Sequence, residues 1–308
     1  MAMGSSTSTS TQQPSEDPPS SSTSDASPSE STTDPSIPIH DTPISGMIAR
    51  PRVAFPAEFG DATDFWVEYP SGLVDISRTA HLPVEAKEDA NFQPPPLKPG
   101  QLEIPVDGDR VVRVDNEKTA LVVIDMQNFF LHPDLRIHKT GLACVQPLMD
   151  VIPPLRSAGS KILWVNWGLT DHELKTLPPS LIRTFKKHNG GGFGSELPGN
   201  FGRLLMRGAY NSDLYEPLQS EYLKGAKNGT DFWIHKNRMS GIWGYQTALD
   251  LFLKENGITT LLFAGVNTDQ DGTATTSPEG GFENVIYNAG NSYGFVTDTK
   301  RVIGAVGH

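Results

Sequence analysis

The stretch Thr119-Ala-Leu-Val-Val-Ile-Asp125 decides the fold, because it runs through five apolar residues and ends on a carboxylate. A continuous apolar run without alternation is typical of a parallel strand that is covered on both faces. Similar runs recur at residues 161–166, 231–235 and 259–265, and stretches with helical apolar spacing lie between them. This alternation predicts an α/β fold, a three-layer α-β-α sandwich around a mainly parallel, Rossmann-like sheet.

Two helices are expected next to these strands. Residues 141–158 place apolar side chains at helical spacing, with a kink expected at Pro153 and Pro154. Residues 245–256 form the second helix, which Gly257 closes, as the C-terminus of a helix prefers.

The composition divides the chain into three parts. Residues 1–45 are rich in Ser, Thr and Pro, with six acidic side chains and no lysine or arginine, so we expect a disordered tail. Residues 46–117 combine short alternating runs with turn residues, which predicts a β-rich, Pro-rich arm with hairpins at residues 64–77 and 102–114. Residues 118–308 hold the alternating strands and helices.

The charge balance limits the partners. The 308 residues carry 25 basic and 36 acidic side chains, a net charge of −11, so the basic excess that nucleic acid binding needs is missing. No stretch reaches the roughly 18 apolar residues of a membrane span, and the first residues lack the pattern of a secretory signal. We therefore expect no nucleic acid, no membrane and a cytoplasmic location. The single cysteine excludes an intramolecular disulfide.

Polar residues stand at the carboxyl ends of the expected strands, where an open parallel sheet forms its ligand crevice. Asp125 ends the first strand and Lys236 follows the third, so a carboxylate and an ammonium are expected to converge on one edge. An ion pair there can hold Asp125 ionised as a base or tune Lys236. Position alone leaves an alternative open, in which Asp125 caps the following turn and Lys236 is only its structural partner.

Three motifs at these strand ends resemble one family. Asp125-Met-Gln-Asn-Phe-Phe130, Lys236-Asn-Arg-Met-Ser-Gly-Ile-Trp243 and Gly265-Val-Asn-Thr-Asp-Gln270 follow one another as in the isochorismatase-like cysteine hydrolases. That superfamily includes nicotinamidases, N-carbamoylsarcosine and ureidoacrylate amidohydrolases, and isochorismatases proper. The resemblance covers residues 118–299, which makes residues 118–308 the hydrolase domain. The arm around residues 65–75 resembles an extension of fungal-type members.

The resemblance implies a triad of Asp, Lys and Cys, in which the thiolate attacks a carbonyl carbon and forms an acyl enzyme. Asp125 matches the base of the family and Lys236 its lysine, and the backbone amides at Val266 and Asn267 match the oxyanion hole. The resemblance further implies a small-molecule substrate, and we expect no cofactor. We also expect no metal, because the adjacent residues Asp171, His172 and Glu173 cannot all face one point on regular structure. The resemblance leaves a homo-oligomer open, because family members are commonly oligomeric.

Several residues near the strand ends are expected to bind the substrate. Phe130 is one of them, and Trp167 and Trp243 are expected to line a pocket for a planar group. Arg238 and Ser240 are expected to bind a carboxylate or carbonyl, with surface roles as the alternative for both.

The third member of the triad is missing. The family's cysteine directly follows the segment that matches Gln270, where this chain has Asp271, and the single cysteine is Cys144. Cys144 precedes an apolar helical stripe and is expected to be a small core residue. We expect one helix-strand unit to be absent after residue 270, with a helix at residues 278–288 and a strand at residues 292–297 after the gap. A point substitution at Asp271 is the alternative.

Two functions stay open. The first is an isochorismatase-like hydrolase of a small amide, ureido or vinyl-ether metabolite, with Asp125 as acid or base and Lys236 as charge stabiliser. The vinyl-ether route does not need the thiol, because a protonated Asp can act as general acid toward the vinyl carbon. The second is a catalytically inactive homologue, either a binding protein or a truncated isoform.

Overall fold

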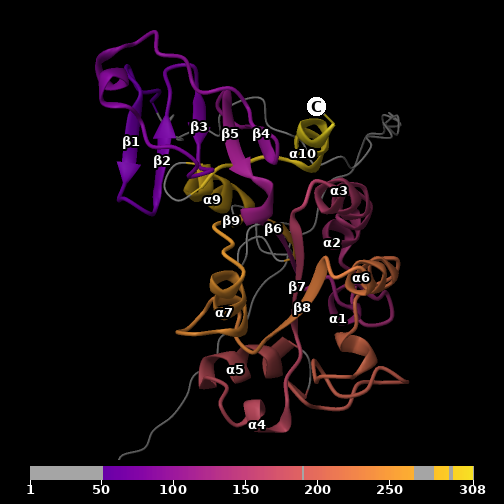
Figure 1. The fold of residues 1–308 in the computed structure, drawn as a ribbon. Coiled ribbons are helices and arrows are strands. Elements are labelled where there is room, and N and C mark those ends of the chain that lie inside the picture. The colour runs from indigo at the N-terminus through magenta and orange to yellow at the C-terminus, as the bar shows by residue number, and fades with distance from the viewer. Residues whose placement is uncertain (1–50, 189–190, 267–280, 291–293, 308) are drawn as a thin grey trace, which may run out of the picture. The chain divides into compact units, whose positions relative to one another are not determined.

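The computed structural model describes residues 51–188, 191–266, 281–290 and 294–307 (Figure 1). The chain divides into two units, Met1–Ile37 and Pro38–His308, and every described residue lies in the second. The tail expected over residues 1–45 and the gap expected after residue 270 both lie outside the described residues.

A four-stranded parallel sheet forms the centre of the second unit. Its strands are β6 (Thr119–Ile124), β7 (Lys161–Trp167), β8 (Asp231–Lys236) and β9 (Thr260–Gly265), in the order β8-β7-β6-β9. All three neighbouring pairs are parallel, with Ile124 opposite both Val165 and Gly265. The carboxyl ends of the strands therefore lie at one edge, and the mainly parallel α/β fold expected from the sequence is confirmed.

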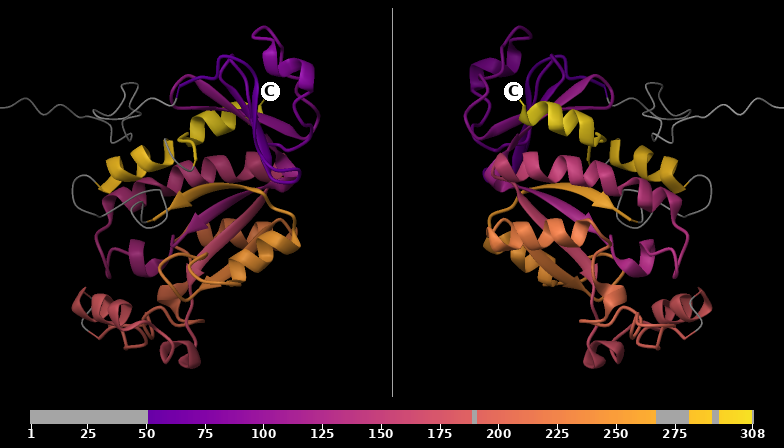
Figure 2. Two further views of the ribbon diagram at one scale, coloured as in Figure 1. Left: turned by 90° about the vertical axis from the view of Figure 1, so that its left-hand side faces the viewer. Right: turned by 90° about the vertical axis from the view of Figure 1, so that its right-hand side faces the viewer.

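Helices cover both faces of this sheet (Figure 2). On one face α3 (Val145–Ser157) and α6 (Leu218–Lys227) pack on the side chains of Leu121 and Trp164. On the other face α7 (Ala248–Glu255) packs on Val122 and Ile234. The alternation of side chains along each strand supplies both apolar faces, which is why the runs in the sequence are continuous.

The helix expected over residues 141–158 is divided. It consists of α2 (Lys139–Ala143) and α3, which meet at Cys144. The second of these continues as one helix through Pro153 and Pro154 to Ser157.

A buried ion network connects α3, α6 and β8. The guanidinium of Arg156 donates two hydrogen bonds of 2.9 Å to the carboxylate of Asp231 and one of 2.6 Å to Glu221. The indole of Trp164 donates a further hydrogen bond of 2.9 Å to Asp231. Because each charge is paired and hydrogen-bonded, the network fixes the position of β8 without leaving a buried charge unsatisfied.

The arm forms a second sheet of five strands in the order β1-β2-β3-β5-β4. Its strands are β1 (Ala57–Gly60), β2 (Phe65–Glu68), β3 (Leu73–Asp75), β4 (Gln101–Val106) and β5 (Arg110–Asp115). The two expected hairpins are present as the antiparallel pairs β2–β3 and β4–β5. Ile104 and Val114 join the same hydrophobic cluster as α3, so this sheet shares the main core.

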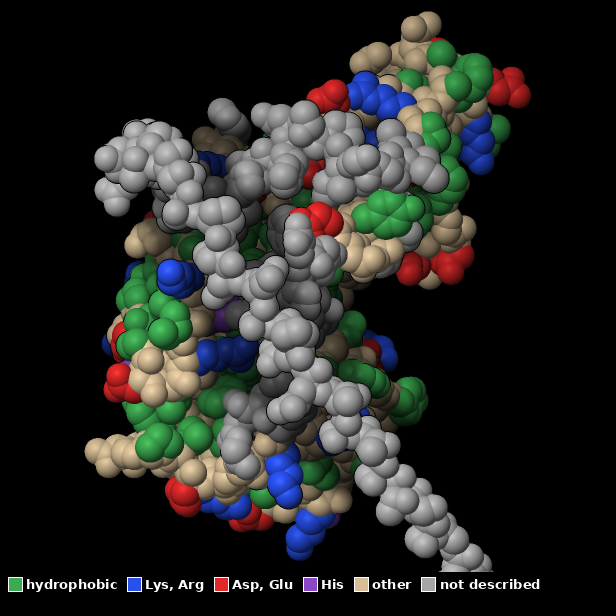
Figure 3. Space-filling view, turned by 180° about the vertical axis from the view of Figure 1, so that it is seen from behind, with side chains coloured by type: hydrophobic (Ala, Val, Ile, Leu, Met, Phe, Trp, Pro, Cys, Tyr) green, Lys and Arg blue, Asp and Glu red, His purple; other side chains and the backbone are tan. Residues whose placement is uncertain are grey.

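The remaining helices are short. They are the 3-10 helices η1 (Val84–Glu88), η2 (Asn116–Lys118) and η3 (Tyr210–Ser212), and the α-helices α1 (Asn128–Leu131), α4 (Asp171–Leu174), α5 (Pro179–His188), α9 (Gly281–Asn288) and α10 (Thr299–Val306). The last of these packs on both α3 and β4. On the face seen in Figure 3, Lys and Arg side chains lie interspersed with Asp and Glu side chains.

The prediction of a strand at residues 292–297 was wrong for residues 294–297, the part of it that the structure describes. Residues 294–298 form no strand, and they lie against the end of β4 instead. The carbonyl of Val296 accepts a hydrogen bond of 2.9 Å from the amide of Asp107, and the hydroxyl of Thr297 donates one of 2.7 Å to the carbonyl of Pro105. These contacts hold the segment on the arm's sheet, and Asp298 then caps the start of α10.

Strand β9 lies at the edge of the parallel sheet in the described part of the chain, where its one partner is β6. The side chain of Phe263, in the middle of β9, is 42% exposed. Both faces of a parallel sheet are normally covered by other elements, so the exposure of an apolar side chain on β9 is unusual.

Candidate active site

The carboxylate of Asp125 and the ammonium of Lys236 meet at the carboxyl edge of the parallel sheet. The Oδ2 atom of Asp125 lies 2.7 Å from Nζ of Lys236, and each side chain is 1% exposed. The two come from β6 and β8, which β7 separates. Removal from water strengthens the attraction between the charges, so this pair is fixed far more firmly than a surface ion pair.

The backbone at Asp125 is held in a conformation that few residues other than glycine adopt. Its φ angle is +50°, directly after the last residue of β6, while its amide still donates to the carbonyl of Val165 over 3.2 Å. Such left-handed residues cost free energy and concentrate at functional sites, where the surroundings enforce them. The turn takes the Asp125 side chain off the strand and toward Lys236.

Three contacts fix the ammonium of Lys236. Besides the ion pair with Asp125, Nζ donates a hydrogen bond of 2.6 Å to the carbonyl of Met239 and lies 4.9 Å from the ring centroid of Trp167. Trp167 is itself buried beneath Phe185 and Phe193, with ring centroids 5.7 Å and 5.1 Å away. A cation over a desolvated indole gains electrostatic stabilisation, so Trp167 stabilises the Lys236 ammonium by a cation–π contact.

Gln127 joins the strand ends to the segment before α6. Its Nε2 donates to the carbonyls of Trp167 and Ser212 over 2.8 and 2.6 Å, and its Oε1 accepts from the amide of Trp167 over 3.0 Å. The side chain is fully buried. Sequence reasoning missed this residue, although its place two residues after Asp125 in the first motif was a signal that could have found it.

The residues expected to bind substrate lie in different surroundings. Phe130 is buried in α1 with its ring against Phe129 at a centroid distance of 4.9 Å. The guanidinium of Arg238 donates to the carbonyls of Asn237 and Thr176 over 2.8 and 2.9 Å, and thus connects the segment after β8 to the residues between α4 and α5. Trp167 is the one that contacts the ion pair.

Two further expected residues follow β8 and lie nearer the surface. The hydroxyl of Ser240 accepts a hydrogen bond of 3.3 Å from the amide of Ile242. Trp243 is 63% exposed, which leaves most of its ring in solvent. Val266 is fully buried, and its amide donates to the carbonyl of Ile124 over 3.0 Å, whereas Asn267 lies outside the described residues.

Cys144 is a partly buried free thiol at the junction of two helices. It lies between α2 and α3, and its thiol donates to the carbonyl of Thr140 over 3.4 Å. Burial raises the pKa of the Cys144 thiol to about 11. The reactive species of cysteine is the thiolate, so Cys144 stays protonated and inert at neutral pH.

The two acidic residues of α4 have structural partners. Glu173 completes a capping box with Thr170, and its Oε1 accepts from the side-chain Nδ2 of Asn237 over 2.9 Å. Asp171 pairs with Arg203 at 2.9 Å. Within the described ranges, no group of three or more His, Cys, Asp or Glu side chains is placed to hold a metal ion.

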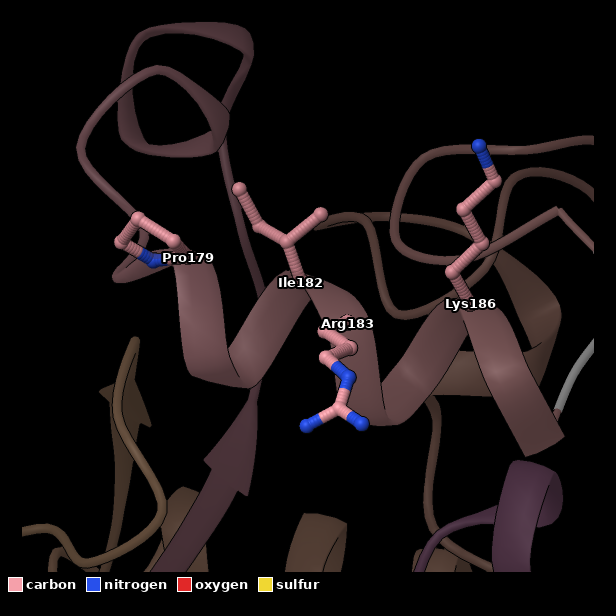
Figure 4. A pocket seen from close by; sticks show the side chains of 4 residues that line it. All are labelled: Pro179, Ile182, Arg183 and Lys186. Carbon is pink, nitrogen blue, oxygen red and sulfur yellow. The ribbon is translucent and has the colours of Figure 1, made fainter. Parts of the chain in front are cut away.

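Two surface hollows are lined by residues other than Asp125 and Lys236. The larger, of about 470 Å³, lies along α5, and Figure 4 shows its lining side chains Pro179, Ile182, Arg183 and Lys186 projecting from that one helix. The second, of about 380 Å³, lies beside β8 and the segment before α6. In the part of the chain that the structure describes, no helix is long and apolar enough to cross a membrane.

Comparison with known proteins identifies the family. The Isochorismatase domain matches residues 119–278, about half of the chain, and the protein belongs to the isochorismatase family. The ureidoacrylate amidohydrolase RutB of Caulobacter segnis is 26% identical over 238 residues, which are 69% of this chain and 95% of that protein. RutB of Pantoea ananatis is 24% identical over 226 residues, 62% of this chain and 83% of that protein.

Solved structures in the same comparison are more distant. A cysteine hydrolase from Pseudomonas syringae pv. phaseolicola has a TM-score of 0.48 and 18% identity, and covers 63% of this chain and 94% of its own. N-carbamoylsarcosine amidase from Thermoplasma acidophilum has a TM-score of 0.42 and 21% identity, and covers 59% of this chain and 96% of its own.

Proposed function

We propose that this protein is an isochorismatase-like hydrolase of a small metabolite, in which Asp125 is the acid or base and Lys236 stabilises charge. The observation that carries the proposal is the buried ion pair, with 2.7 Å between Oδ2 and Nζ. Residues 118–308 form the hydrolase domain in this proposal, and residues 46–117 form an arm that packs on it.

Among the amide, ureido and vinyl-ether substrates of the family, the chemistry of this chain favours the vinyl ether. The relatives at about 25% identity are ureidoacrylate amidohydrolases. An amidase route through a thioester needs a thiolate. The one cysteine of this chain, Cys144, lies between α2 and α3 and has a pKa of about 11, so it supplies little thiolate at neutral pH. Hydrolysis of a vinyl ether requires a proton donor and water. Asp125 can be the proton donor, and Lys236 can stabilise the charge that develops.

Because the resting pair is charged, the proposed reaction first needs the uptake of one proton by the Asp125 carboxylate, and this proton is then transferred to the terminal vinyl carbon. The ether carbon becomes an oxocarbenium ion, and the carboxylate that is left is stabilised by the Lys236 ammonium at 2.7 Å. Water then adds to the oxocarbenium carbon and returns a proton to Asp125. The hemiketal that forms breaks its bond to the leaving alcohol and yields a ketone.

An inactive homologue is the second candidate, and two observations favour it. The sequence has Asp271 where the family has its cysteine. Phe263 on β9 is 42% exposed, which fits a sheet that has lost a neighbouring strand. In that case the ion pair is a structural remnant, and the protein binds a ligand or partner without turning it over.

The two candidates are separated by an assay of purified, monodisperse protein. The substrates are isochorismate, whose hydrolysis releases pyruvate, and a panel of small amides and ureido compounds. Wild type is compared with Asp125→Asn, and circular dichroism confirms that both are folded. Turnover that the variant abolishes supports the hydrolase, and the absence of turnover from folded wild type contradicts it.

The expected absence of a helix-strand unit after residue 270 is tested on the messenger RNA. Sequencing of the transcript across the codons of Gln270 and Asp271 shows whether a longer message inserts a Cys-led segment there. A message of that kind would make this chain a truncated isoform, whereas a single uninterrupted message would establish the cysteine-free chain as the product of the gene.

A further inference from the structure

A hollow lies on the face of β8 opposite to Lys236. His235 and Lys236 are neighbours on the strand, so their side chains point to opposite faces of the sheet. The hollow has a volume of about 380 Å³. It is lined by Arg207, Gly208, Ser212, Asp213, Gln219, Tyr222, Trp233 and His235.

Three hydrogen-bond donors gather in this hollow. Burial, together with the nearby Arg207 guanidinium, lowers the pKa of His235 to about 4, so the imidazole is neutral at pH 7. Its Nδ1 accepts a hydrogen bond of 3.1 Å from the indole of Trp233, which leaves Nε2 with the hydrogen. The guanidinium of Arg207 is the second donor, and its side chain is 48% exposed. Its Nε donates to the carbonyl of Gly168 over 3.3 Å and its Nη2 lies 3.9 Å from Oε2 of Glu173, which leaves further N–H groups of the five that a guanidinium carries.

Ser212 supplies the third donor, and its state indicates a ligand. The residue is 3% exposed, and within the described ranges its hydroxyl has no hydrogen-bond partner. Asn166, directly opposite His235 on β7, is fully buried, and neither its amide nitrogen nor its oxygen has a partner among the described residues. Buried polar groups are nearly always satisfied, so the hydroxyl of Ser212, which lines the hollow, points to a polar occupant.

The hollow also contains a negative charge and an apolar wall. Burial raises the pKa of Asp213, and its carboxylate forms no ion pair with any residue that the structure describes. Tyr222 and Trp233 are half-buried and pack edge to face, with ring centroids 5.1 Å apart. A cation beside Asp213 and a planar or apolar group against these rings would complete the surroundings that the residues provide.

We propose that this hollow binds a small zwitterion, an α-amino acid with an aromatic side chain. Its carboxylate accepts hydrogen bonds from Arg207, Ser212 and His235, and its ammonium pairs with Asp213. Its ring lies against Trp233 and Tyr222. The site does not depend on the function of the Asp125–Lys236 pair, because it lies on the other face of β8 and shares no residue with that pair.

The test uses L-phenylalanine as the probe and the full-length protein in isothermal titration calorimetry. Two matched compounds keep the phenyl ring and only one of the two charged groups: 3-phenylpropionate lacks the ammonium, and phenethylamine lacks the carboxylate. We expect saturable binding of phenylalanine and affinities for each half-compound that are weaker by about tenfold or more. No saturation up to about 10 mM phenylalanine, or equal affinity for 3-phenylpropionate, would overturn the proposal.

Variants locate the binding. Arg207→Gln and Asp213→Asn remove one charge each, the second at nearly constant size, and the backbone carbonyl of Asp213 still accepts from the amide of Asn128. Each is expected to weaken phenylalanine binding by about tenfold or more. Arg183→Gln, in the hollow along α5, is the matched control and is expected to bind like wild type. If both pocket variants retain wild-type affinity while folded, phenylalanine binds elsewhere and the proposal fails.

Discussion

Substitution of Lys236 by methionine tests how strongly the buried pair holds the active-site edge together. Methionine keeps an unbranched side chain of similar length, so the packing on Trp167 is largely preserved and the loss is electrostatic. The variant leaves the carboxylate of Asp125, 1% exposed, without the ammonium at 2.7 Å. Removal of one partner from a buried pair costs about 3–5 kcal/mol. At roughly 2–4 °C per kcal/mol for a domain of this size, the melting temperature falls by about 6–20 °C.

Urea unfolding followed by circular dichroism measures this loss. The double variant Asp125→Asn/Lys236→Met removes both charges and is expected to recover most of the stability, to within about 1 kcal/mol of wild type. Lys254→Met is the matched control, because Lys254 pairs with Asp250 at 2.8 Å with its side chain 64% exposed, and it should cost less than about 1 kcal/mol. A cost below about 1 kcal/mol for Lys236→Met, or a double variant as unstable as the single one, would refute this reasoning.

Four further outcomes can be measured. Arg156→Met leaves the buried carboxylate of Asp231 unpaired and is expected to lower the free energy of unfolding in urea by about 3 kcal/mol or more. Phe263 is 42% exposed, so Phe263→Ala should cost about 2–3 kcal/mol, against about 3–5 for a fully buried phenylalanine, and a loss of about 4 kcal/mol or more would show that β9 is covered. Burial holds the pKa of His138 at about 4, below its ordinary 6.5, so stability falls as pH drops from 6.5 toward 4, and His138→Gln should flatten this dependence by about one proton. Cys144 should react with iodoacetamide at pH 8 about a hundred times more slowly in folded than in urea-unfolded protein, because its pKa rises from 9.0 to about 11.

The strands and the ion pair could be predicted because they depend on local patterns. A continuous apolar run identifies a strand with two covered faces, and the end of each run identifies the residue at the crevice. Asp125 and Lys236 were found in this way, and the structure brings them together. Trp167 was expected in a pocket, and its contact with Lys236 follows from the register that places it opposite that residue.

What the sequence could not predict depends on contacts between distant segments. The side chain of Gln127 binds the carbonyl of Ser212, 85 residues later, and no local pattern reports such a contact. Arg238 similarly donates to the carbonyl of Thr176, 62 residues earlier in the chain, and its role in substrate binding stays a prediction. The segment that contains Val296 has the composition of a strand, but it is held on the arm by two hydrogen bonds, one with Asp107 and one with Pro105.

The rate of pyruvate release from isochorismate tests the central claim most directly, with wild type compared to Asp125→Asn and Cys144→Ser. The claim is that the buried Asp125–Lys236 pair supports hydrolysis without a thiol. It predicts turnover by wild type, an equal rate for Cys144→Ser, and a loss of about a hundredfold or more for Asp125→Asn, since a positioned acid contributes about that much. A wild-type rate no higher than that of buffer, or equal rates for wild type and Asp125→Asn, would contradict it.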